Sequence, residues 1–418
     1  ITDLSGDVLQ SKKYWSVDSF LSPVNEDIDI EELTSLLSDS FSYRTVSDVP
    51  FVSFLSSGID STLVATLLRS KGIPLNTLTI GVDNSKYDEA SQSKIISAHL
   101  GTNHVEKYIS GRDIGELFDD VFFSFDEPFA DSSIFPTYAV CKEAAMKYKV
   151  ALSADGGDEL FGGYQRYLFL SKFKNVIQMP KPLKGILLIF LKTLERTGCL
   201  KLIKMGSLSL KLVKIKNAIL SKNLSELYVS LSSYMSDKRC SEVLLDYVPT
   251  NGAYDKFNTY YKKSGEDLLN TAMAIDYETY LYQILIKVDR ASMANSLEVR
   301  EPLLDHRLIE KVLPYPSKNK IKKSKPKFWL KEIIKKTSGE LFSSKTKKGF
   351  SVPIDDWLKD DLRKKVDFYL SEDNLKKSNV FDVSEVFKLK SNFYKNGENY
   401  IELWHIFVFQ AWYIRWFE

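Results

Sequence analysis

The stretch that decides the fold runs from residue 50 to residue 80 and reads PFVSFLSSGIDSTLVATLLRSKGIPLNTLTI. A short apolar run, 50–55, ends in a turn of small polar residues, and an amphipathic segment, 61–70, follows that turn. A second apolar run then occupies residues 75–80. Short apolar runs that alternate with longer amphipathic segments are typical of a parallel β-sheet with helices on both faces.

The same alternation continues beyond this stretch, so we expect an α/β fold with four or five parallel strands. Beyond residue 163 the sequence changes to long segments rich in lysine and leucine with helical spacing, which predict a mainly α-helical second half. The elements expected between the two regions are helices at 90–100, 114–123 and 137–148, and strands at 105–109 and 150–153.

The composition is typical of a soluble globular protein, with 44% hydrophobic and 27% charged residues in a chain of 418. The chain contains 57 basic and 55 acidic residues, and the resulting net charge of +2 gives no reason to expect a nucleic acid or a membrane as partner. The apolar run GILLIFL at 185–191 is too short to span a bilayer and predicts a buried helix. Three distant cysteines without a CxxC pair argue against disulfides or zinc and favour the cytoplasm.

The first 29 residues mix polar and aromatic residues without a helical or strand period, which predicts a linker or docking arm. The chain opens with Ile1 and without a signal peptide, so we expect a processed product or an excised fragment.

The turn SSGIDS at 56–61 joins the first predicted strand to the first predicted helix. Small residues at this junction allow backbone N–H groups and hydroxyls to approach an anion, and the helix N-terminus adds a partial positive charge. Asp60 beside a bound phosphate requires a cation between them, for which Mg²⁺ is the natural choice. The alternative is a serine-rich turn in which Asp60 caps the helix. A Walker loop is excluded because GxxxxGK[ST] is absent.

A second loop, SADGGDELFGGY at 153–164, follows the strand predicted at 150–153. Ligands of a parallel sheet lie outside the carboxyl ends of its strands, so the two loops are expected to face one cleft. Asp155 and Asp158 on this glycine-rich loop indicate metal binding or proton transfer. The alternative is a flexible surface turn.

The first loop resembles the SGGxDS pyrophosphate loop of the ATP-pyrophosphatase superfamily, with Ser57 at a usual glycine position. The second is similar to the SGDGGDELFGGY segment of the asparagine synthetase family, with Ala154 at the first glycine. The blocks 287–294, 298–305 and 345–350 also resemble that family, and they occur in the expected order. Over about residues 14–357, the chain resembles the synthetase part of these enzymes, without the glutamine-hydrolysing domain that usually precedes it.

This resemblance implies a five-stranded parallel sheet of the ATP-pyrophosphatase type flanked by helices, with a largely helical C-terminal half. It places an arm at 1–29 before a synthetase domain at 30–418. Within that domain the nucleotide-binding part would cover 30–168 and the helical part 169–418.

The implied reaction is adenylation of a carboxylate by ATP, followed by attack of ammonia to give an amide, AMP and pyrophosphate. Aspartate is the default acceptor, and ammonia would come free or from a separate glutaminase. Asp60 and Asp158 would bind Mg²⁺, and Asp155 would lie beside the acyl-adenylate as a proton-handling or positioning group. Lys347, or its neighbour Lys348, would be the catalytic lysine. The implied ATP contacts are Leu55, Ser56, Ser57, Gly58, Asp60, Ser61, Ile80, Ser153 and Ala154, and the implied acceptor contacts are Asp131, Ser132 and Arg300.

Several alternatives stay open at this level. Another carboxylate, such as a sugar acid, a β-amino acid precursor or a peptide, would replace aspartate if the acceptor pocket differs, and Tyr282-Gln283 stands where relatives commonly carry an acid. The lysine-rich segment 311–348 would serve a tRNA-modifying relative, although a solvated lysine face is the commoner outcome. A scaffold that retains the fold without catalysis is the last alternative. The charged residues of 287–300, expected on helices behind the cleft, are either an ion-pair network or substrate contacts. The chain could also form a homodimer.

Overall fold

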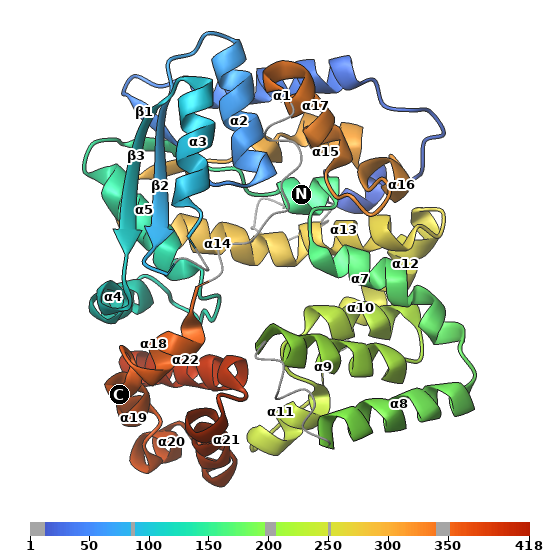
Figure 1. The fold of residues 1–418 in the computed structure, drawn as a ribbon, viewed down its shortest axis with the longest axis vertical. Helices are drawn as coiled ribbons and strands as arrows, with labels where there is room; N and C mark the ends of the chain where they lie inside the picture. Colours follow the sequence, from blue (N-terminus) through green and yellow to red (C-terminus); the bar gives the residue numbers. More distant parts are fainter. Residues whose placement is uncertain (1–12, 85–87, 197–205, 250–251, 340–351) are drawn as a thin grey trace, which may run out of the picture.

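A five-stranded, fully parallel sheet forms the centre of the computed structural model, which describes residues 13–84, 88–196, 206–249, 252–339 and 352–418 (Figure 1). The strand order is β3-β2-β1-β4-β5, so the chain builds the sheet outward from β1 in one direction and then in the other. The loops after β1 and β4 therefore meet where the order reverses, which is the usual ligand position in such a sheet. The strands are β1 (Phe51–Phe54), β2 (Asn76–Val82), β3 (Asn103–Ile109), β4 (Val150–Leu152) and β5 (Glu298–Arg300).

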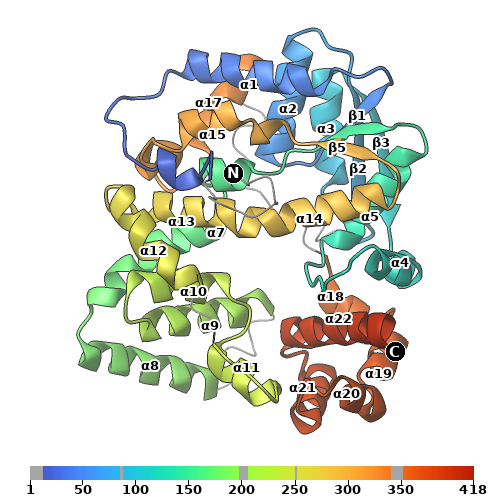
Figure 2. The ribbon, with the colours of Figure 1, turned by 180° about the vertical axis from the view of Figure 1, so that it is seen from behind.

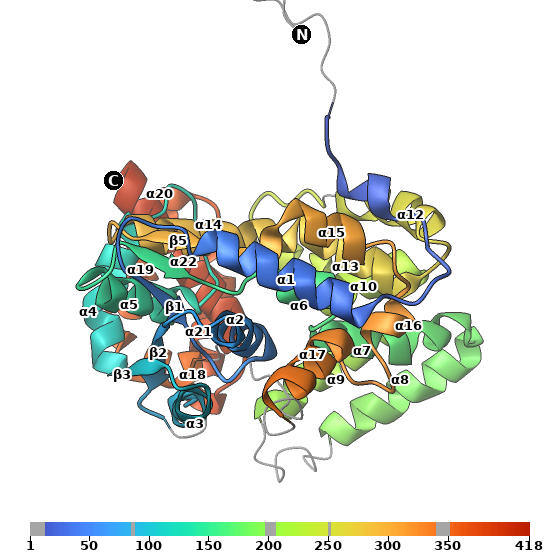
Figure 3. The same cartoon turned by 90° about the horizontal axis from the view of Figure 1, so that it is seen from above.

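Helices cover both faces of this sheet, and each face has its own apolar core. One core joins Leu63 and Leu67 of α2 to Phe41 of α1, and the other joins Phe118 of α4 to Phe135 of α5. Seen from above, α1 crosses the molecule from α2 towards α15 (Figure 3). The helices of this part are α1 (Ile30–Arg44), α2 (Ile59–Ser70), α3 (Ala90–Leu100), α4 (Gly111–Phe123), α5 (Ile134–Ala145) and α6 (Gly157–Phe161).

The rest of the described chain is helical apart from β5, which confirms the predicted fold class. Helices α13 and α14 lie below the sheet, with the lobe α7–α12 at one end and the lobe α18–α22 at the other (Figures 1 and 2). Their bounds are α7 (Gln165–Phe173), α8 (Lys181–Arg196), α9 (Gly206–Leu220), α10 (Leu224–Ser232), α11 (Asp237–Val243), α12 (Gly252–Lys263), α13 (Leu268–Glu278), α14 (Tyr280–Met293), α15 (His306–Val312), α16 (Ser317–Lys320), α17 (Phe328–Ser338), α18 (Ile354–Lys359), α19 (Arg363–Tyr369), α20 (Glu372–Ser378), α21 (Val383–Asn396) and α22 (Tyr400–Phe417). Short 3₁₀ turns lie at Val17–Phe20, Lys174–Gln178 and Pro302–Leu304.

The prediction for residues 298–300 was wrong, because it placed them on a helix. They form β5, which pairs with β4 from Val150↔Glu298 to Leu152↔Arg300. The strand is only three residues long, so its alternation of charged and apolar side chains is too short to count as a strand signal, and the pairing with β4 decides its conformation.

One further expectation about the helical half is wrong, and another holds with two exceptions. The run 185–191 does form a helix, α8, but Ile186, Ile189 and Phe190 are exposed, so the helix is not buried. In the described part of the lysine-rich segment most lysines are exposed, as a solvated lysine face requires, but Lys320 and Lys327 are only 0% and 3% exposed. Both lysines are held by partners that are distant in the sequence, which a local pattern cannot reveal.

The arm before α1 lies against the body of the protein over its described part. Val17 and Leu21 are buried, and Trp15 Nε1 donates to Glu310 Oε1 at 2.9 Å. None of the helices in the described ranges combines the length and the apolar character that are needed to cross a bilayer.

Candidate active site

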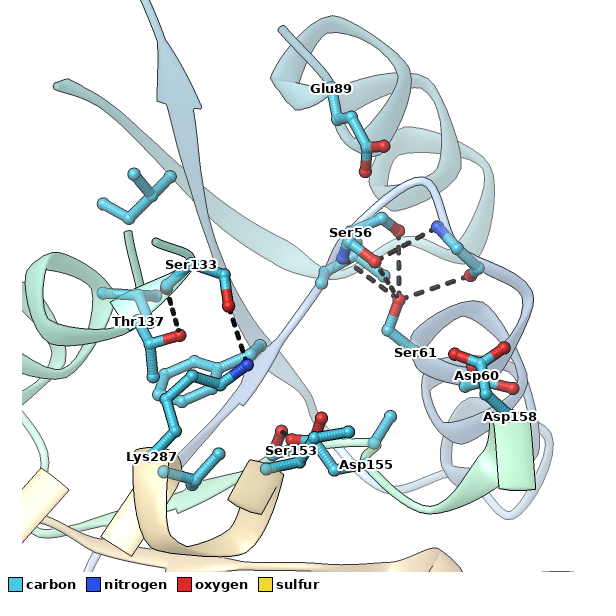
Figure 4. A pocket seen from close by; sticks show the side chains of 18 of the residues that line it. Ser56, Asp60, Ser61, Glu89, Ser133, Thr137, Ser153, Asp155, Asp158 and Lys287 are labelled. Carbon is cyan, nitrogen blue, oxygen red and sulfur yellow. Dashed lines mark hydrogen bonds between the residues drawn. The ribbon is translucent and has the colours of Figure 1, made fainter. Parts of the chain in front are cut away.

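A cavity of about 310 Å³ opens at the carboxyl ends of β1, β2 and β4. Its walls are the β1–α2 loop, the β4–α6 loop, the start of α5 and one side of α14 (Figure 4). The two loops that the sequence singled out therefore do face one cleft.

The β1–α2 loop is tied together by its own hydroxyl groups. Ser61 Oγ lies 2.9 Å from Ser56 Oγ and accepts from Ser56 N at 3.1 Å, while Gly58 N donates to Ser56 Oγ at 3.1 Å (Figure 4). The loop leads directly into the 12-residue helix α2, whose first turn faces the cavity. The partial positive charge of this N-terminus favours an anion.

Two buried carboxylates lie side by side at this end of the cavity. Asp60, in the first turn of α2, and Asp158, in α6, are each 6% exposed. Lys327, the residue before α17, forms ion pairs with both of them, and its Nζ lies 2.5 Å from Asp158 Oδ1. A lysine between two carboxylates offsets their repulsion, so both can stay ionised in a buried position.

Two glycines of the second loop make room for this triad of Asp60, Asp158 and Lys327. A Cβ atom on Gly163 would lie 1.8 Å from Asp158 Oδ1 and 2.2 Å from Lys327 Cε. A Cβ atom on Gly157 would lie 2.6 Å from Asp60 Oδ1. The glycine-rich composition of the loop is therefore required by the close approach of the charged side chains.

The donor set of this triad fits Mg²⁺ that is bound together with a nucleotide. Mg²⁺ prefers oxygen ligands and is usually held by one or two carboxylates plus substrate phosphates and water. Asp60 and Asp158 supply two such carboxylates beside an anion-binding helix N-terminus. Within the described ranges no group of three or more His, Cys, Asp or Glu side chains could hold a metal ion by itself, so phosphate and water oxygens would complete the coordination.

A second carboxylate pair lies at the end of β4. Ser153 Oγ donates to Asp155 Oδ2 at 2.6 Å, and Asp155 N donates to Glu301 Oε2 at 3.0 Å. Burial, and then the charge of Asp155, raise the pKa of Glu301 well above its usual range. The raised pKa favours the neutral form of Glu301 beside Asp155.

The opposite end of the cavity carries a cation and an anion. Lys287 Nζ, from α14, donates to Ser133 Oγ at 2.8 Å and lies 3.4 Å from Asp131 Oδ2 (Figure 4). Desolvation would raise the pKa of Asp131, but the charge of Lys287 and the hydrogen bonds from Ser133 outweigh it and lower that pKa. Asp131 is therefore an anion that is 39% exposed.

Two tyrosines form one wall between these ends. Tyr164 and Tyr280 line the cavity, and the guanidinium carbon of Arg166 lies 4.4 Å and 4.3 Å from their ring centroids. Arg166 is held in turn by Asp276, with Nε donating to Oδ2 at 2.9 Å. Burial raises the pKa of both phenols, so the wall is neutral and fixed in place.

Most of the residues that the sequence proposed for the site do line the cavity, namely Leu55, Ser56, Gly58, Asp60, Ser61, Ile80, Asp131, Ser153, Ala154, Asp155 and Asp158. Ser57 and Ser132 are not among the lining residues, although their neighbours Ser56 and Ser133 are. Lys347 and Lys348 lie outside the described residues.

Arg300 is not brought to the cavity. Its Nη1 donates to the carbonyl oxygens of Arg44 and Val46 at 3.0 Å and 2.7 Å, so it fastens β5 to the segment after α1. Tyr282 also lies away from the cavity, with 65% of its surface exposed, while Tyr280 lines it. These placements move the acceptor end of the site from Arg300 towards Lys287 and Tyr280.

Sequence reasoning missed Lys327, Glu301 and Tyr280 as residues of this region, and it left Lys287 undecided between an ion pair and a substrate contact. The only local signal for Lys327 was its position in a lysine-rich segment, which is a weak signal. Glu301 and Lys287 both lie in blocks that were recognised, but their spatial partners come from other parts of the chain.

Comparison with known proteins identifies the family to which the chain is similar. The sequence model of the family described as asparagine synthase matches residues 32–414. Asparagine synthetase [glutamine-hydrolyzing] 1 of Bacillus subtilis is 28% identical over 394 residues, which are 93% of this chain and 59% of that protein. Asparagine synthetase [glutamine-hydrolyzing] 3 of the same organism is 27% identical over 349 residues, covering 79% of this chain and 49% of that protein. The chain thus spans about half the length of these relatives.

Proposed function

Because the chain belongs to the asparagine synthase family, we propose that it activates a carboxylate with ATP and transfers the activated acyl group to ammonia. The observation that carries this proposal is the triad Asp60–Lys327–Asp158 at the N-terminus of α2. It provides a buried, charged site for the polyphosphate of a nucleotide, next to a cavity in which a second substrate can lie.

In this proposal the phosphates of ATP bind over the first turn of α2. Backbone and hydroxyl groups of Ser56, Gly58 and Ser61 hold them, and Lys327 contributes a positive charge. The adenosine would lie against the strand ends at Leu55 and Ile80. Mg²⁺ held by Asp60 and Asp158 would neutralise charge on the pyrophosphate as it leaves.

The first chemical step is attack by an oxygen of the acceptor carboxylate on the α-phosphorus of ATP. The bond between the α-phosphorus and the bridging oxygen breaks, and pyrophosphate leaves. Ammonia then attacks the acyl carbon, and AMP leaves with the oxygen that came from the carboxylate. Asp155, which lines the cavity beside Glu301, would accept the proton that the attacking nitrogen loses.

In this proposal Lys347 is a second cationic side chain at the site, in addition to Lys327. A lysine near the reacting atoms would stabilise charge on the α-phosphate and then on the oxyanion of the second step. Its role rests on the family resemblance of the 345–350 block.

Aspartate is the proposed acceptor because the far end of the cavity offers one cation and one anion. Lys287 can bind the α-carboxylate of an amino acid, and Asp131 can bind its ammonium group. The β-carboxylate would then point towards Asp155 and the phosphates. The proposed product is asparagine, with ammonia supplied free or by a glutaminase, in the cytoplasm where ATP is available.

The test is a panel of carboxylates. The full chain is incubated with ATP, Mg²⁺ and ammonium, and each carboxylate is added singly, beginning with aspartate. The account predicts AMP, pyrophosphate and asparagine in equal amounts with aspartate, and none with the Lys347→Ala variant. AMP and pyrophosphate with a different acid alone would change the substrate and keep the mechanism. If no acid yields these products while the protein still binds Mg²⁺ and ATP, the proposal fails.

A further inference from the structure

The outward side of α8 is apolar, which is unusual for a helix at the rim of a protein. Leu183, Ile186, Ile189 and Phe190 are 50%, 64%, 67% and 57% exposed. Their spacing of three and four residues places them on one side of the helix, and we call these four residues the α8 face. A helix at a protein surface normally turns its polar residues outward.

The opposite side of α8 is the one that holds it to the protein. Leu191 is buried, and Lys184 Nζ donates to the carbonyl oxygen of Ser221 at 3.1 Å, close to the end of α9. Helix α8 lies at the outer edge of its lobe, remote from the sheet (Figures 1 and 2). The α8 face is therefore an apolar surface that points away from the rest of the described chain.

The stretch of sequence that contains α8 is strongly basic. Between Lys172 and Lys222 the sequence holds 12 lysines and arginines and a single acid, Glu195, which gives 12 − 1 = +11. The whole chain carries only +2, so the remainder carries 2 − 11 = −9. The described lysines at the exposed surface of this region include Lys172, Lys174, Lys181 and Lys222.

The charge decides which kind of partner fits. A second copy of the same chain would bring two positively charged regions together, which is unfavourable. An exposed apolar helix side within a lysine-rich stretch is instead typical of helices that lie in the plane of a membrane, where the apolar side chains enter the boundary of the acyl chains. The lysines then meet anionic head groups.

We propose that the α8 face docks the protein peripherally on an anionic lipid membrane. The helix would lie parallel to the surface, with Ile186, Ile189 and Phe190 inserted at the level of the head groups. This goes beyond the proposed reaction and does not depend on it. It also replaces the expectation that no membrane is a partner, because that expectation considered only the net charge of the whole chain and the length of the apolar run.

The test is cosedimentation of the full chain with lipid vesicles. One set contains neutral phosphatidylcholine, and the other contains about one third anionic phosphatidylglycerol. We expect binding to the anionic vesicles to be at least about tenfold tighter than to the neutral ones, and to weaken as the salt concentration rises.

The variant that tests the face is Ile186→Glu together with Ile189→Glu. It should reduce binding to the anionic vesicles by roughly tenfold or more, because it removes apolar contacts and adds negative charge. The matched control is Ile95→Glu on α3, an isoleucine that is 47% exposed and distant in sequence from the face. Phe190→Ser is a second variant without an added charge. Unchanged melting temperatures will show that each variant is folded.

Three results would overturn the proposal. The first is that the wild-type chain binds neither set of vesicles, and the second is that it binds both sets equally. The third is that the double variant converts a dimer into a monomer and leaves vesicle binding as it was, in which case the face joins two copies of the chain.

Discussion

The two ends of the cavity are built in different ways. At the phosphate end, Asp60 and Asp158 are each 6% exposed and lie in the first turns of α2 and α6, the helices that follow the neighbouring strands β1 and β4. At the acceptor end, Asp131 is 39% exposed, and Lys287, which pairs with it, comes from α14, more than 150 residues later in the chain. The first end is closed and held by small residues, whereas the second is open and made of side chains from separate helices.

In the proposed function, the phosphate end would serve the chemical step and the acceptor end would serve substrate selectivity. The phosphate end provides what any ATP-dependent adenylation needs, namely hydrogen-bond donors, a helix N-terminus and ligands for Mg²⁺. In the proposed function, the charges at the acceptor end would determine which carboxylate can bind. Changes at the phosphate end should therefore abolish every reaction, and changes at the acceptor end should alter the affinity for one substrate.

The largest effect is expected from Asp158→Asn. Loss of one of the two proposed metal ligands should lower the rate of pyrophosphate formation by about 10³-fold with every acceptor. The matched control is Asp119→Asn, which removes a surface pair with Lys365 and should leave the rate unchanged. A rate within about tenfold of wild type would show that Asp158 does not act in the reaction.

Lys327→Met tests the same end through stability. Removal of the lysine leaves two buried carboxylates facing each other, which should lower the free energy of unfolding by about 3–5 kcal/mol. Mg²⁺ with ATP should stabilise this variant more than it stabilises the wild type, because the cation would replace the missing charge. Thermal denaturation with and without Mg²⁺ and ATP measures both effects. The control is Lys331→Met, in the first turn of α17. An equal loss of unfolding free energy in this control would contradict the role of the triad.

Gly163→Ala tests the close packing of the triad. The added methyl group would meet Asp158 and Lys327, so we expect a loss of about 1–3 kcal/mol in stability and a loss of activity. In Gly185→Ala the new Cβ has no atom within 4 Å and the glycine lies inside α8, so this variant should gain about 0.5–1 kcal/mol. Chemical denaturation distinguishes the two, and equal effects would argue against the packing described.

Asp131→Asn tests the acceptor end. We expect KM for the acceptor to rise roughly tenfold to a hundredfold, while KM for ATP stays within about twofold, because only one charge contact is lost. Initial rates at varied acceptor and varied ATP measure the two constants. Asp126→Asn, which breaks an exposed pair with Arg290, is the control. A rise in KM for ATP of the same size would place Asp131 at the phosphate end.

The smallest effect concerns Glu301, between the two ends. Its folded-state pKa is raised, so above its usual value near 4.5 the folded chain holds a proton that the unfolded chain has released. Stability must then fall as pH rises from that value. Between pH 5 and pH 8, Glu301→Gln should therefore lose less stability than the wild type as pH rises. Glu298→Gln, at the exposed start of β5, should follow the wild type. Glu301→Gln would also follow the wild type if the pKa of Glu301 were ordinary.

The sequence predicted the phosphate end well because that end consists of local features. A strand, a loop of small residues and a helix follow one another at 50–70, and both loops carry their carboxylates in recognisable blocks. The class of fold followed from the same alternation of short and long segments.

What the sequence did not predict depends on contacts between distant segments. Lys327 reaches Asp60 across 267 residues, and β5 becomes a strand only by pairing with β4. The run 185–191 was interpreted as a buried helix because an apolar run too short for a membrane usually packs in a core, but the run does not show whether its side chains face the protein or the solvent. The acceptor end combines both difficulties, which is why the substrate was left open.

The most direct test of the central claim uses an acceptor whose carboxylate oxygens are labelled with ¹⁸O. The acceptor is the carboxylate that the panel identifies, and AMP, pyrophosphate and inorganic phosphate are analysed by mass spectrometry after turnover with ammonium. Adenylation at the phosphate end predicts one ¹⁸O atom in AMP and none in pyrophosphate. Label in inorganic phosphate, with ADP as the nucleotide product, would mean that the carboxylate attacks the γ-phosphorus, and would contradict the account.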